Sequence, residues 1–449
     1  MKSFTSFPYD HVLVLGLAKS GLAASKLCLE QGKKVRINDI STGENDAEVA
    51  ELNLLGAEMV LGSHPLSVLD DIEVVVKNPG IPYENPIIVE AEKRNIPIIT
   101  EIELAGQLAN ESIIGITGSN GKTTVTMLIT EILKKSEQPA KIAGNIGVVA
   151  SDVVQTLQPN EQMVMELSSF QMLGTQTFKP KIAVLLNIFE AHLDYHKTFE
   201  NYRKAKSQIF LNQTEEDYLV YNHDEKNVKE IVKHARSTKI PFSLNEKLSN
   251  GAWVDSYYVY FKNEKIIERR LIRLVGKHNL ENILAAICAA KLGGAKNEGI
   301  YEVLTTFSGV KHRLQFVDRI QNRLFYNDSK ATNILATQQA LSAFNQPIIL
   351  LAGGLDRGNE FTGLLPYMKH VKAMVVFGET KEKLKQLAAA SDIKDVYNVE
   401  NVHEAAQKAY EISAKNDVIL LSPACASWDQ YKTFEERGNM FIQAVHTLV

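Results

Sequence analysis

The sequence predicts an α/β protein of three domains, each built on a mostly parallel sheet. Its 449 residues are enough for about three domains of ordinary size. Apolar runs of strand length repeatedly end on glycine-rich or polar turns and are followed by helical patterns, as in parallel α/β folds. One such turn, at residues 118–124, has the composition of a phosphate-binding loop. We place the domains at residues 1–101, 102–309 and 310–449.

Composition and charge narrow the class of protein. Hydrophobic residues make up 45% and charged residues 23%, which is typical of soluble globular proteins. A net charge of −4 with no long basic run disfavours a nucleic-acid partner. The cysteines, Cys28, Cys288 and Cys425, form no C-x-x-C pair, which fits a reducing compartment. Because no apolar run has membrane-span length and no signal-peptide pattern is present, we expect a cytoplasmic protein with small-molecule partners.

The first domain begins with a mononucleotide-binding pattern. An apolar run at 12–15 enters the glycine turn 16–21, a helical pattern follows, and a second apolar run ends at Asp39. This β-α-β order predicts a Rossmann-like domain, in which an acid about 20 residues after the turn reaches a ribose or a base. Asp39 is therefore a candidate ligand. Ala18 replaces the middle glycine of G-x-G-x-x-G, so a plain turn remains an alternative.

A second turn of the first domain follows the apolar run 74–76. It contains Asn78 and Gly80. Because turns at the carboxyl ends of parallel strands form the ligand crevice of such sheets, we expect both residues to lie near the first glycine turn.

The central domain is organised around the glycine-rich turn. Gly118 and Gly121 let successive amides face phosphate oxygens, Lys122 adds a charge for the β and γ phosphates, and Thr123 offers a hydroxyl to Mg²⁺. The full phosphate-loop pattern requires another glycine where this chain has Ile116, so only the core G-x-x-G-K-T is matched. We predict a P-loop ATPase-like domain that binds a nucleotide triphosphate.

The strands expected after this loop also end on polar groups. Asn145 follows a strand at 142–143, and Glu166 ends the run 163–165. Glu166 has the position of a hard oxygen ligand for Mg²⁺ beside Thr123. The alternative interpretations of Glu166 are a helix N-cap or a solvated acid.

The segment 190–196 holds two histidines and two acids. The spacing suggests zinc, but no second ligand cluster is apparent, and a nearby phosphate loop favours magnesium. A plain surface position remains an alternative for these histidines, especially His196. The basic run 202–206 looks on composition like a solvated helix face.

The third domain repeats the strand-then-turn pattern. Lys311 to Arg313 follow a glycine at 309, where we place the boundary, and polar turns follow apolar runs at 328–333, 353–358 and 422–429. This order predicts a second Rossmann-like domain with its own crevice. The polar groups of these turns include Lys330, Thr332, Arg357 and Ser422, which we expect at that crevice edge.

These segments together resemble one family. The motifs that carry the resemblance are Gly118-Ser-Asn-Gly-Lys-Thr-Thr124, Gly144-Asn-Ile-Gly147, Glu166-Leu-Ser-Ser-Phe-Gln171, His192-Leu-Asp194, Gly276-Lys-His-Asn279, His312-Arg313, Asp328-Ser-Lys-Ala-Thr-Asn333 and Ser422-Pro-Ala-Cys-Ala-Ser427. They resemble the Mur ligases of peptidoglycan synthesis, and the last two resemble the D-glutamate-adding members. The resemblance spans all three expected domains.

The resemblance implies an ATP-driven amide synthesis. The alanyl carboxylate of UDP-N-acetylmuramoyl-L-alanine would attack the γ-phosphate, and the amine of D-glutamate would then attack the acyl phosphate. It implies ATP and two Mg²⁺ sites, with Lys206 carbamylated so that its oxygens can ligate a cation. Family members often carry an acid directly before the histidine, where this chain has Ala191 after Glu190. We expect a monomer.

The expected site residues fall into five groups. The catalytic group is Lys122, Glu166, His192 and Lys206, and the metal ligands are Thr123, Glu166, His192 and Lys206. The ATP-binding group is Gly118, Ser119, Asn120, Gly121, Lys122, Thr123, Thr124, Asn279, Asn282, Arg313 and Asp328. The group for the UDP substrate is Gly16, Leu17, Ala18, Lys19, Ser20, Asp39, Asn78, Gly80, Asn145 and His192. The D-glutamate group is Lys330, Thr332, Arg357, Ser422 and Tyr431.

Other classes of protein remain open on sequence alone. A nicotinamide-dependent oxidoreductase would use the unit from Gly16 to Asp39 but would leave the phosphate loop unexplained. A P-loop ATPase that engages a protein partner would turn over ATP without an amino acid. Another Mur ligase or a folylpolyglutamate synthetase would share the central loop but would not explain the 328–332 and 422–425 segments.

Overall fold

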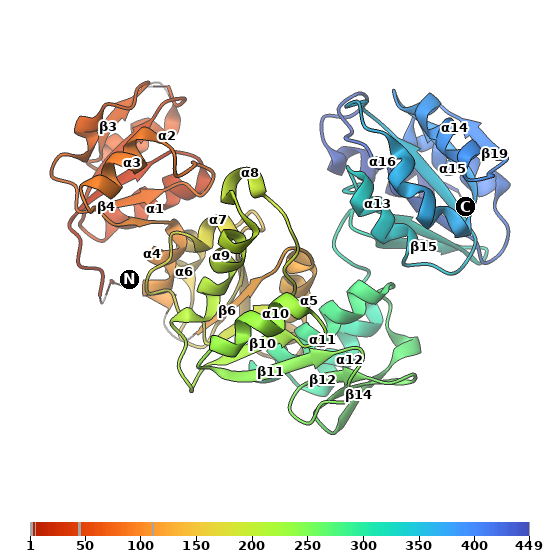
Figure 1. Ribbon diagram of the computed structural model, residues 1–449, viewed down its shortest axis with the longest axis horizontal. Helices are drawn as coiled ribbons and strands as arrows, with labels where there is room; N and C mark the ends of the chain where they lie inside the picture. Colours follow the sequence, from red (N-terminus) through yellow and green to blue (C-terminus); the bar gives the residue numbers. More distant parts are fainter. Residues whose placement is uncertain (1–2, 5, 44–45, 110–111, 449) are drawn as a thin grey trace. The chain divides into compact units, whose positions relative to one another are not determined.

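The chain forms three sheets, which lie in two compact units (Figure 1). The computed structural model describes residues 3–4, 6–43, 46–109 and 112–448. One unit is Met1–Arg270 with Glu281–Val303 and contains the first two sheets, and the other is Leu271–Leu280 with Leu304–Val449. No helix in the described ranges combines the length and apolar character that crossing a bilayer requires.

The first sheet is fully parallel and has the order β3-β2-β1-β4-β5. Its strands are β1 (His11–Leu15), β2 (Lys34–Asp39), β3 (Glu58–Leu61), β4 (Val74–Lys77) and β5 (Ile98–Ile99). Its helices are α1 (Lys19–Glu30), α2 (Ala47–Leu54), α3 (Pro86–Lys93) and the 3-10 turn η1 (Leu66–Leu69). The predicted glycine turn and the turn after β4 therefore leave neighbouring strands, β1 and β4, at the same edge.

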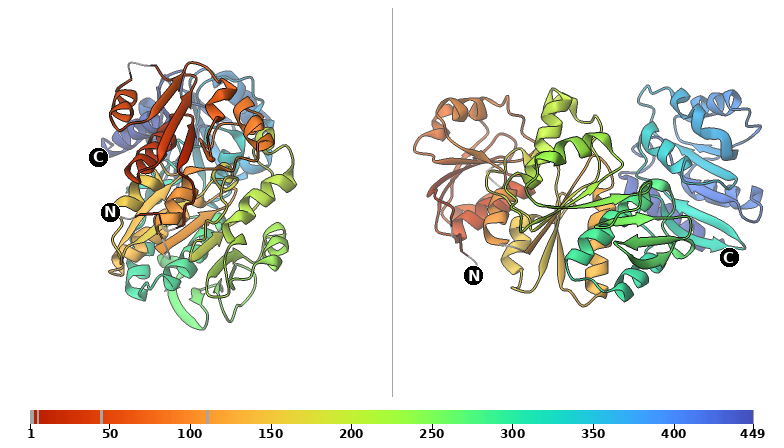
Figure 2. Two further views of the ribbon diagram at one scale, coloured as in Figure 1. Left: turned by 90° about the vertical axis from the view of Figure 1, so that its left-hand side faces the viewer. Right: turned by 60° about the horizontal axis from the view of Figure 1, so that its bottom comes forward.

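The second sheet has nine strands in the order β14-β13-β12-β11-β10-β9-β6-β8-β7. They are β6 (Ile113–Thr117), β7 (Ala140–Gly144), β8 (Gln162–Glu166), β9 (Ile182–Leu185), β10 (Tyr218–Asn222), β11 (Thr238–Ser243), β12 (Ala252–Val254), β13 (Tyr258–Phe261) and β14 (Glu264–Glu268). The sheet is parallel from β7 to β12, and only the β12-β13-β14 meander is antiparallel. The right view of Figure 2 shows these strands, yellow to green, side by side.

Helices cover this sheet and connect it to its neighbours. They are α4 (Glu101–Ala109), α5 (Lys122–Lys135), α6 (Ala150–Thr156), α7 (Ser169–Met172), α8 (Leu193–His196), α9 (Phe199–Leu211), α10 (Lys226–Ile231), η3 (Val232–His234), η4 (Arg269–Leu271), α11 (Lys277–Leu292) and α12 (Asn297–Thr306). Ile102 and Leu104 of α4 belong to one buried cluster with Val12 of β1 and Met163 of β8. The first two sheets therefore share a hydrophobic core.

The third sheet has the order β15-β16-β20-β17-β18-β19 and is parallel except for the β15-β16 hairpin. Its elements are β15 (Gln315–Ile320), β16 (Arg323–Asn327), α13 (Ile334–Leu341), β17 (Ile348–Gly353), η5 (Phe361–His370), β18 (Val371–Phe377), α14 (Lys381–Ala390), β19 (Asp395–Asn398), α15 (Val402–Ile412), β20 (Val418–Leu421) and α16 (Phe434–His446). Separate apolar clusters lie on its two faces. The predicted α/β class with mostly parallel sheets is confirmed.

Candidate functional site

The glycine-rich turn joins β6 to the first turn of α5. Gly121 has a left-handed backbone (φ +86°) and directly precedes Lys122, the first residue of the helix. Lys122 is partly buried, and its Nζ donates to the carbonyl of Gly118 at 2.9 Å. Thr123 and Thr124 lie in the same helical turn. The loop therefore delivers its amides, a lysine and a hydroxyl to one helix N-terminus, as phosphate binding requires.

Two glycines of this loop have no room for a side chain. A Cβ at Gly118 would lie 2.9 Å from the Cβ of Leu186, and one at Gly121 would collide with Oδ1 of Asn282. Asn282 from α11 therefore lies against the loop. Ile116, which replaces the first glycine of the full pattern, is buried in β6 and pairs with Glu166 of β8.

The loop is braced by its neighbours on both sides. The amide of Asn120 donates to Oδ1 of Asn187 at 2.8 Å, and Oγ of Ser119 lies 3.0 Å from the hydroxyl of Tyr202. Asn187 follows β9 and Tyr202 lies on α9. Elements far apart in sequence therefore fix the shape of the loop.

Glu166 ends β8 and is 3% exposed. Its Oε1 accepts from Nδ2 of Asn145 at 2.9 Å, whereas its Oε2 has no hydrogen-bond partner among the described residues. A buried carboxylate oxygen without a donor fits a cation better than the alternative of a helix N-cap or solvated acid. No cluster of three or more His, Cys, Asp or Glu side chains that could hold a metal occurs in the described part of the chain. A Mg²⁺ ion here would need other oxygens, such as hydroxyl, phosphate or water oxygens.

Lys206 on α9 is buried, which corrects the interpretation of 202–206 as a solvated face. It is 1% exposed, and its Nζ donates to the carbonyl of Gly118 at 2.8 Å and lies 4.7 Å from the centre of the Tyr202 ring. Burial, together with the charge of Lys122, holds the pKa of Lys206 well below its usual value. Two lysine side chains thus meet at one carbonyl of the phosphate loop.

His192 and His196 lie at the two ends of helix α8. His192 precedes the helix with a left-handed backbone (φ 54°, ψ 37°) and has an exposed side chain. Partial burial lowers its pKa, and the charge of Lys206 lowers it further. His196 is buried, and its Nε2 lies 2.9 Å from Oγ of Ser169, so the surface interpretation of His196 was wrong. Burial lowers the pKa of His196 to about 4, which keeps its ring neutral.

The acids beside these histidines face solvent. Glu190 and Asp194 are both exposed. The ring of Phe170, from the segment that follows Glu166, packs edge-on against His192 at 5.0 Å between centroids. An aromatic ring therefore holds His192 in place.

The glycine turn of the first sheet is closed by Asp39. One oxygen of Asp39 accepts from the amide of Leu17 at 2.7 Å, and the other accepts from the amides of Ser41 and Thr42. Although burial raises its pKa, these amides lower the pKa of Asp39 to about 2. A Cβ at Gly21 would collide with the carbonyl of Gly16, so the turn needs a glycine there. Asp39 therefore shapes the turn, and a ligand would have to share oxygens that already accept amides.

The turn after β4 lies against the same glycine turn. Nδ2 of Asn78 donates to Oγ of Ser20 at 3.2 Å, and the amide of Gly80 donates to Oδ1 of Asn78 at 3.2 Å. Ala18 and Lys19 lie at the start of α1, beside Ser20. The structure thus brings the predicted residues of the first domain together at one edge of the first sheet.

Three of the expected ATP residues belong to the second unit. Asp328 follows β16; it accepts from the amide of Leu314 at 3.0 Å and from Oγ of Ser422 at 3.0 Å, and burial raises its pKa to about 7. Arg313 is exposed, and Asn279 is buried with its Nδ2 on the carbonyl of Val275. The contacts described for these three residues all lie within their own unit.

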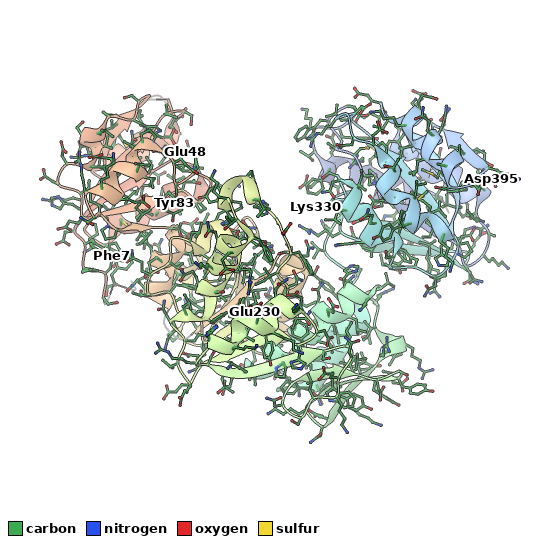
Figure 3. The ribbon with its side chains drawn as sticks, in the orientation of Figure 1. Phe7, Glu48, Tyr83, Glu230, Lys330 and Asp395 are labelled. Atoms are coloured by element: carbon green, nitrogen blue, oxygen red, sulfur yellow. The ribbon has the colours of Figure 1, made fainter. Side chains whose placement is uncertain are left out.

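The expected D-glutamate residues divide into two sets. Lys330 and Arg357 are exposed, with the Lys330 ammonium 4.7 Å from the Phe434 ring centre and the Arg357 guanidinium 4.6 Å from that of Trp428. Lys330 extends from the surface of its unit (Figure 3). The amide of Thr332 donates to the carbonyl of Lys330 at 2.8 Å, so these two residues share one turn. Each of these two exposed cations lies over an aromatic ring.

Ser422 and Tyr431 form the second set, because both are engaged inside the unit. Ser422 is fully buried, and its hydroxyl bonds to Asp328 and to Thr337. The hydroxyl of Tyr431 accepts from the amide of Val402 at 3.2 Å. Direct contact with a ligand is thus not favoured for either side chain.

Sequence reasoning missed two buried side chains of this unit. Ser427 is 1% exposed, and its hydroxyl has no partner among the described residues. Arg437 is fully buried and donates to Ser329 and to the carbonyls of Gly353 and Cys425, so it joins the turns after β16 and β20 to the end of β17. The segment 422–427 contains Ser427, but no local signal marks Arg437 on α16.

Comparison with known proteins follows the same three-part division. The sequence matches the MurD-like N-terminal domain of Mur ligases over residues 10–100, the Mur ligase middle domain over 116–290, and the Mur ligase glutamate ligase domain over 312–425. Among solved structures, it resembles UDP-N-acetylmuramate-alanine ligase from Thermotoga maritima, with 20% identity, a TM-score of 0.57, and 97% of this chain and 99% of that chain covered. It also resembles UDP-N-acetylmuramoylalanyl-D-glutamyl-2,6-diaminopimelate--D-alanyl-D-alanyl ligase from Acinetobacter baumannii, with 16% identity, a TM-score of 0.59, and 97% and 93% covered. These likenesses support the fold.

Sequence relatives are much more similar. A UDP-N-acetylmuramoylalanine--D-glutamate ligase from Oceanobacillus iheyensis is 60% identical over 448 residues, which is 100% of both chains. Proteins of the same name from Geobacillus kaustophilus and Bacillus pumilus are each 55% identical, over 100% and 98% of both chains respectively. With this identity along its whole length, the chain belongs to the Mur ligase family.

Proposed function

We propose that the protein is an ATP-dependent, ADP-forming ligase that joins D-glutamate to the L-alanyl carboxylate of UDP-N-acetylmuramoyl-L-alanine. The names of its full-length relatives support this choice of substrates. One observation carries the chemistry: Lys122 and Lys206 meet at the carbonyl of Gly118 in a glycine-rich loop. Glu166 ends the neighbouring strand β8, and its Oε2 has no hydrogen-bond partner among the described residues. The charge of Lys122, a hard oxygen ligand and a buried lysine that can become a ligand, all at one helix N-terminus, suit transfer of the γ-phosphate.

The reaction has two bond-forming steps. The alanyl carboxylate attacks the γ-phosphate and ADP leaves, which gives an acyl phosphate. The amine of D-glutamate then attacks the acyl carbon, loses a proton, and expels phosphate from the tetrahedral intermediate to leave an amide. Lys122 and the loop amides balance the charge on the phosphates in the first step.

We propose that donors around the loop hold two Mg²⁺ ions, and the buried Oε2 of Glu166, which has no hydrogen-bond partner among the described residues, supports one of them. We assign one ion to the hydroxyl of Thr123 and Oε2 of Glu166, and the other to His192 and a carbamylated Lys206. Bound Mg²⁺ would neutralise phosphate charge and orient the γ-phosphate. Carbamylation joins CO₂ to a neutral amine with release of a proton, and the lowered pKa of buried Lys206 supplies that amine.

The substrates are assigned to the crevice edges described above. The UDP substrate would lie at the turns 16–20 and 78–80 with Asp39, Asn145 and His192. Besides the loop 118–124, ATP would use Asn279, Asn282, Arg313 and Asp328. Lys330, Thr332 and Arg357 are the accessible candidates for D-glutamate.

The domain limits and the state of the protein complete the proposal. We assign residues 1–101 to the UDP substrate, 102–309 to ATP and 310–449 to the amino acid. We expect a cytoplasmic protein that is a monomer. Sedimentation analysis tests the oligomeric state.

The decisive experiment measures ADP release with UDP-muramoyl precursors crossed against a panel of amino acids. We expect turnover only with UDP-N-acetylmuramoyl-L-alanine and D-glutamate together. ATP turnover without an amino acid would favour a partner-driven ATPase and overturn the proposal. A parallel calorimetric titration with NAD and with the UDP substrate tests the first domain, where tighter binding of NAD would refute its assignment.

A further inference from the structure

Lys77, the last residue of β4, is a buried lysine to which the mechanism gives no role. It is 1% exposed and forms no ion pair within the described ranges of the chain. Its Nζ donates to the carbonyl of Ile81 at 2.7 Å and to the carbonyls of Asn78 and Pro79 at 3.2 and 3.3 Å. Burying an ammonium among neutral oxygens without a carboxylate partner costs free energy, so stability alone does not account for Lys77.

The three carbonyls belong to the turn that borders the proposed uridine-nucleotide crevice. Within this turn the amide of Ile81 donates to the carbonyl of Asn78 at 3.0 Å. The turn packs closely on Gly16, because a Cβ there would lie 2.8 Å from Cδ1 of Ile81 and 3.0 Å from Cβ of Asn78. By holding this turn, Lys77 fixes one wall of the crevice.

Lys77 also reaches helix α8 of the second sheet. Its Nζ lies 3.1 Å from the hydroxyl of Tyr195, and that hydroxyl in turn lies 3.3 and 3.1 Å from the carbonyls of Pro79 and Ile81. The ring of Tyr83, labelled in Figure 3, covers the ammonium at 4.8 Å. Lys77 of the first sheet and Tyr195 of helix α8 thus bond to the same two carbonyls, those of Pro79 and Ile81.

Tyr195 is one helical turn from His192. Its amide donates to the carbonyl of His192 at 3.2 Å. The Phe170 ring packs edge-on against both side chains, with centroid distances of 4.6 Å to Tyr195 and 5.0 Å to His192. A displacement of Tyr195 would therefore be passed to His192 through the short helix and through Phe170.

We propose that Lys77 is a positioning residue that couples binding of the uridine nucleotide to the placement of His192, by joining the 78–81 turn to α8 through Tyr195. The inference rests on the proposed function, since it assigns the nucleotide to the first domain and His192 to the metal site. Binding of the nucleotide orders the turn, and the shared hydrogen bonds transmit that order to α8.

Kinetics of substituted proteins test this role. Lys77→Met removes the ammonium but keeps an unbranched apolar side chain, and we expect KM for the UDP substrate to rise tenfold or more while KM for ATP stays within about threefold. Tyr195→Phe leaves the three carbonyl bonds of Lys77 intact, so we expect kcat to fall several-fold with KM for the UDP substrate within about threefold. Lys77→Met also removes the bond to Tyr195, so we expect its kcat to fall several-fold as well, and kcat of the double variant should fall no further than that of either single variant, because both substitutions break one link.

The chain provides a matched control. The exposed pair of Glu84 and Lys197, 2.8 Å apart, joins the same two segments of chain. We expect Glu84→Gln to leave kcat and every KM unchanged, because exposed ion pairs contribute little. A purely structural role for Lys77 would lower the melting temperature of Lys77→Met without changing KM for the UDP substrate, and that result would overturn the inference.

Hydrogen exchange with the intact protein gives a second measurement if Lys77→Met does not fold. On addition of UDP-N-acetylmuramoyl-L-alanine, we expect amides of the 16–21 and 78–81 turns and of α8 to gain protection. In Tyr195→Phe the turns should still gain it and α8 should not. Equal protection of α8 in the Tyr195→Phe variant would refute the coupling alone. Absence of protection at both turns in the unsubstituted protein would instead refute the assignment of the nucleotide to the first domain.

Discussion

Replacing Lys206 by alanine tests the central site most directly. If Lys206 carries a carbamate that ligates Mg²⁺, the substitution removes a negative charge next to the ion. One pair of unit charges about 4 Å apart contributes about 4 kcal/mol at an effective dielectric constant of about 20, which corresponds to a roughly thousandfold fall in kcat. Stability should change little or increase, because Lys206 is 1% exposed and buries its polar end without a carboxylate partner.

The assay is ADP release at saturating substrates, with and without a short carboxylic acid such as acetate. The acid can enter the space left by the side chain and supply the missing oxygens, so we expect Lys206→Ala to recover at least tenfold in its presence. Lys204→Ala is the matched control, because Lys204 lies on the same helix but is exposed. It should turn over at the parental rate and gain nothing from the acid.

Two results would refute this reasoning. A Lys206→Ala protein with the parental kcat would show that neither the lysine nor its carbamate is needed. An inactive protein that melts at the parental temperature and is not rescued by any short acid would leave a role for the ammonium, which would act as a donor to the Gly118 carbonyl.

Three further predictions concern other parts of the chain. Lys122→Ala should fold normally and lose ATP-dependent turnover, since its charge serves the phosphates; retained turnover would remove the proposed role of the loop. Lys330→Ala should abolish much of the preference for D-glutamate over D-glutamine in kcat/KM, with a loss of roughly 30-fold or more if the pair is desolvated; an unchanged preference would exclude Lys330. Glu101, buried and bonded to the amide of Ser151, has its pKa raised by burial from 4.5 to about 7. The folded state therefore holds the proton of Glu101 more tightly than the unfolded state does. The free energy of unfolding that this residue contributes is full below pH 4.5 and is lost as the pH rises through 7. The loss is at most about 3 kcal/mol. Glu101→Gln should remove this part of the fall in melting temperature between pH 5 and pH 8, and equal falls in both proteins would contradict it.

The parts of the site that a sequence can predict are those formed by a few consecutive residues. The phosphate loop is an example, because Gly118, Gly121, Lys122 and Thr123 are placed by one strand, one turn and one helix start. Ile116 replaces the first glycine of the full phosphate-loop pattern. It does not disturb the loop, because it lies inside β6 and pairs with Glu166 before the loop begins. Local geometry therefore determines this site.

Residues whose role depends on distant partners could not be predicted from local patterns. The run from Tyr202 to Lys206 has the composition of a solvated face, yet Lys206 is buried because α9 packs across the loop and places it on Gly118. Ser422 offers a hydroxyl at a strand end, but that hydroxyl bonds to Asp328 of a different turn. In both cases the decisive contact joins residues at least 88 positions apart in sequence.

Lys77, beside the proposed uridine-nucleotide crevice, and Lys206, at the phosphate loop, have similar surroundings. Each is 1% exposed, each donates to backbone carbonyls, and neither forms an ion pair in the described residues. Burial lowers the pKa of Lys77 only to about 8, so it keeps its proton at neutral pH and can hold a turn of carbonyls. Burial, to which the charge of Lys122 adds, holds the pKa of Lys206 well below its usual value and favours the neutral amine that the proposed carbamylation needs. Burial alone lowers the pKa of Lys77, whereas a neighbouring cation adds to burial at Lys206, so in this proposal Lys77 serves as a fixed donor and Lys206 is the lysine suited to modification.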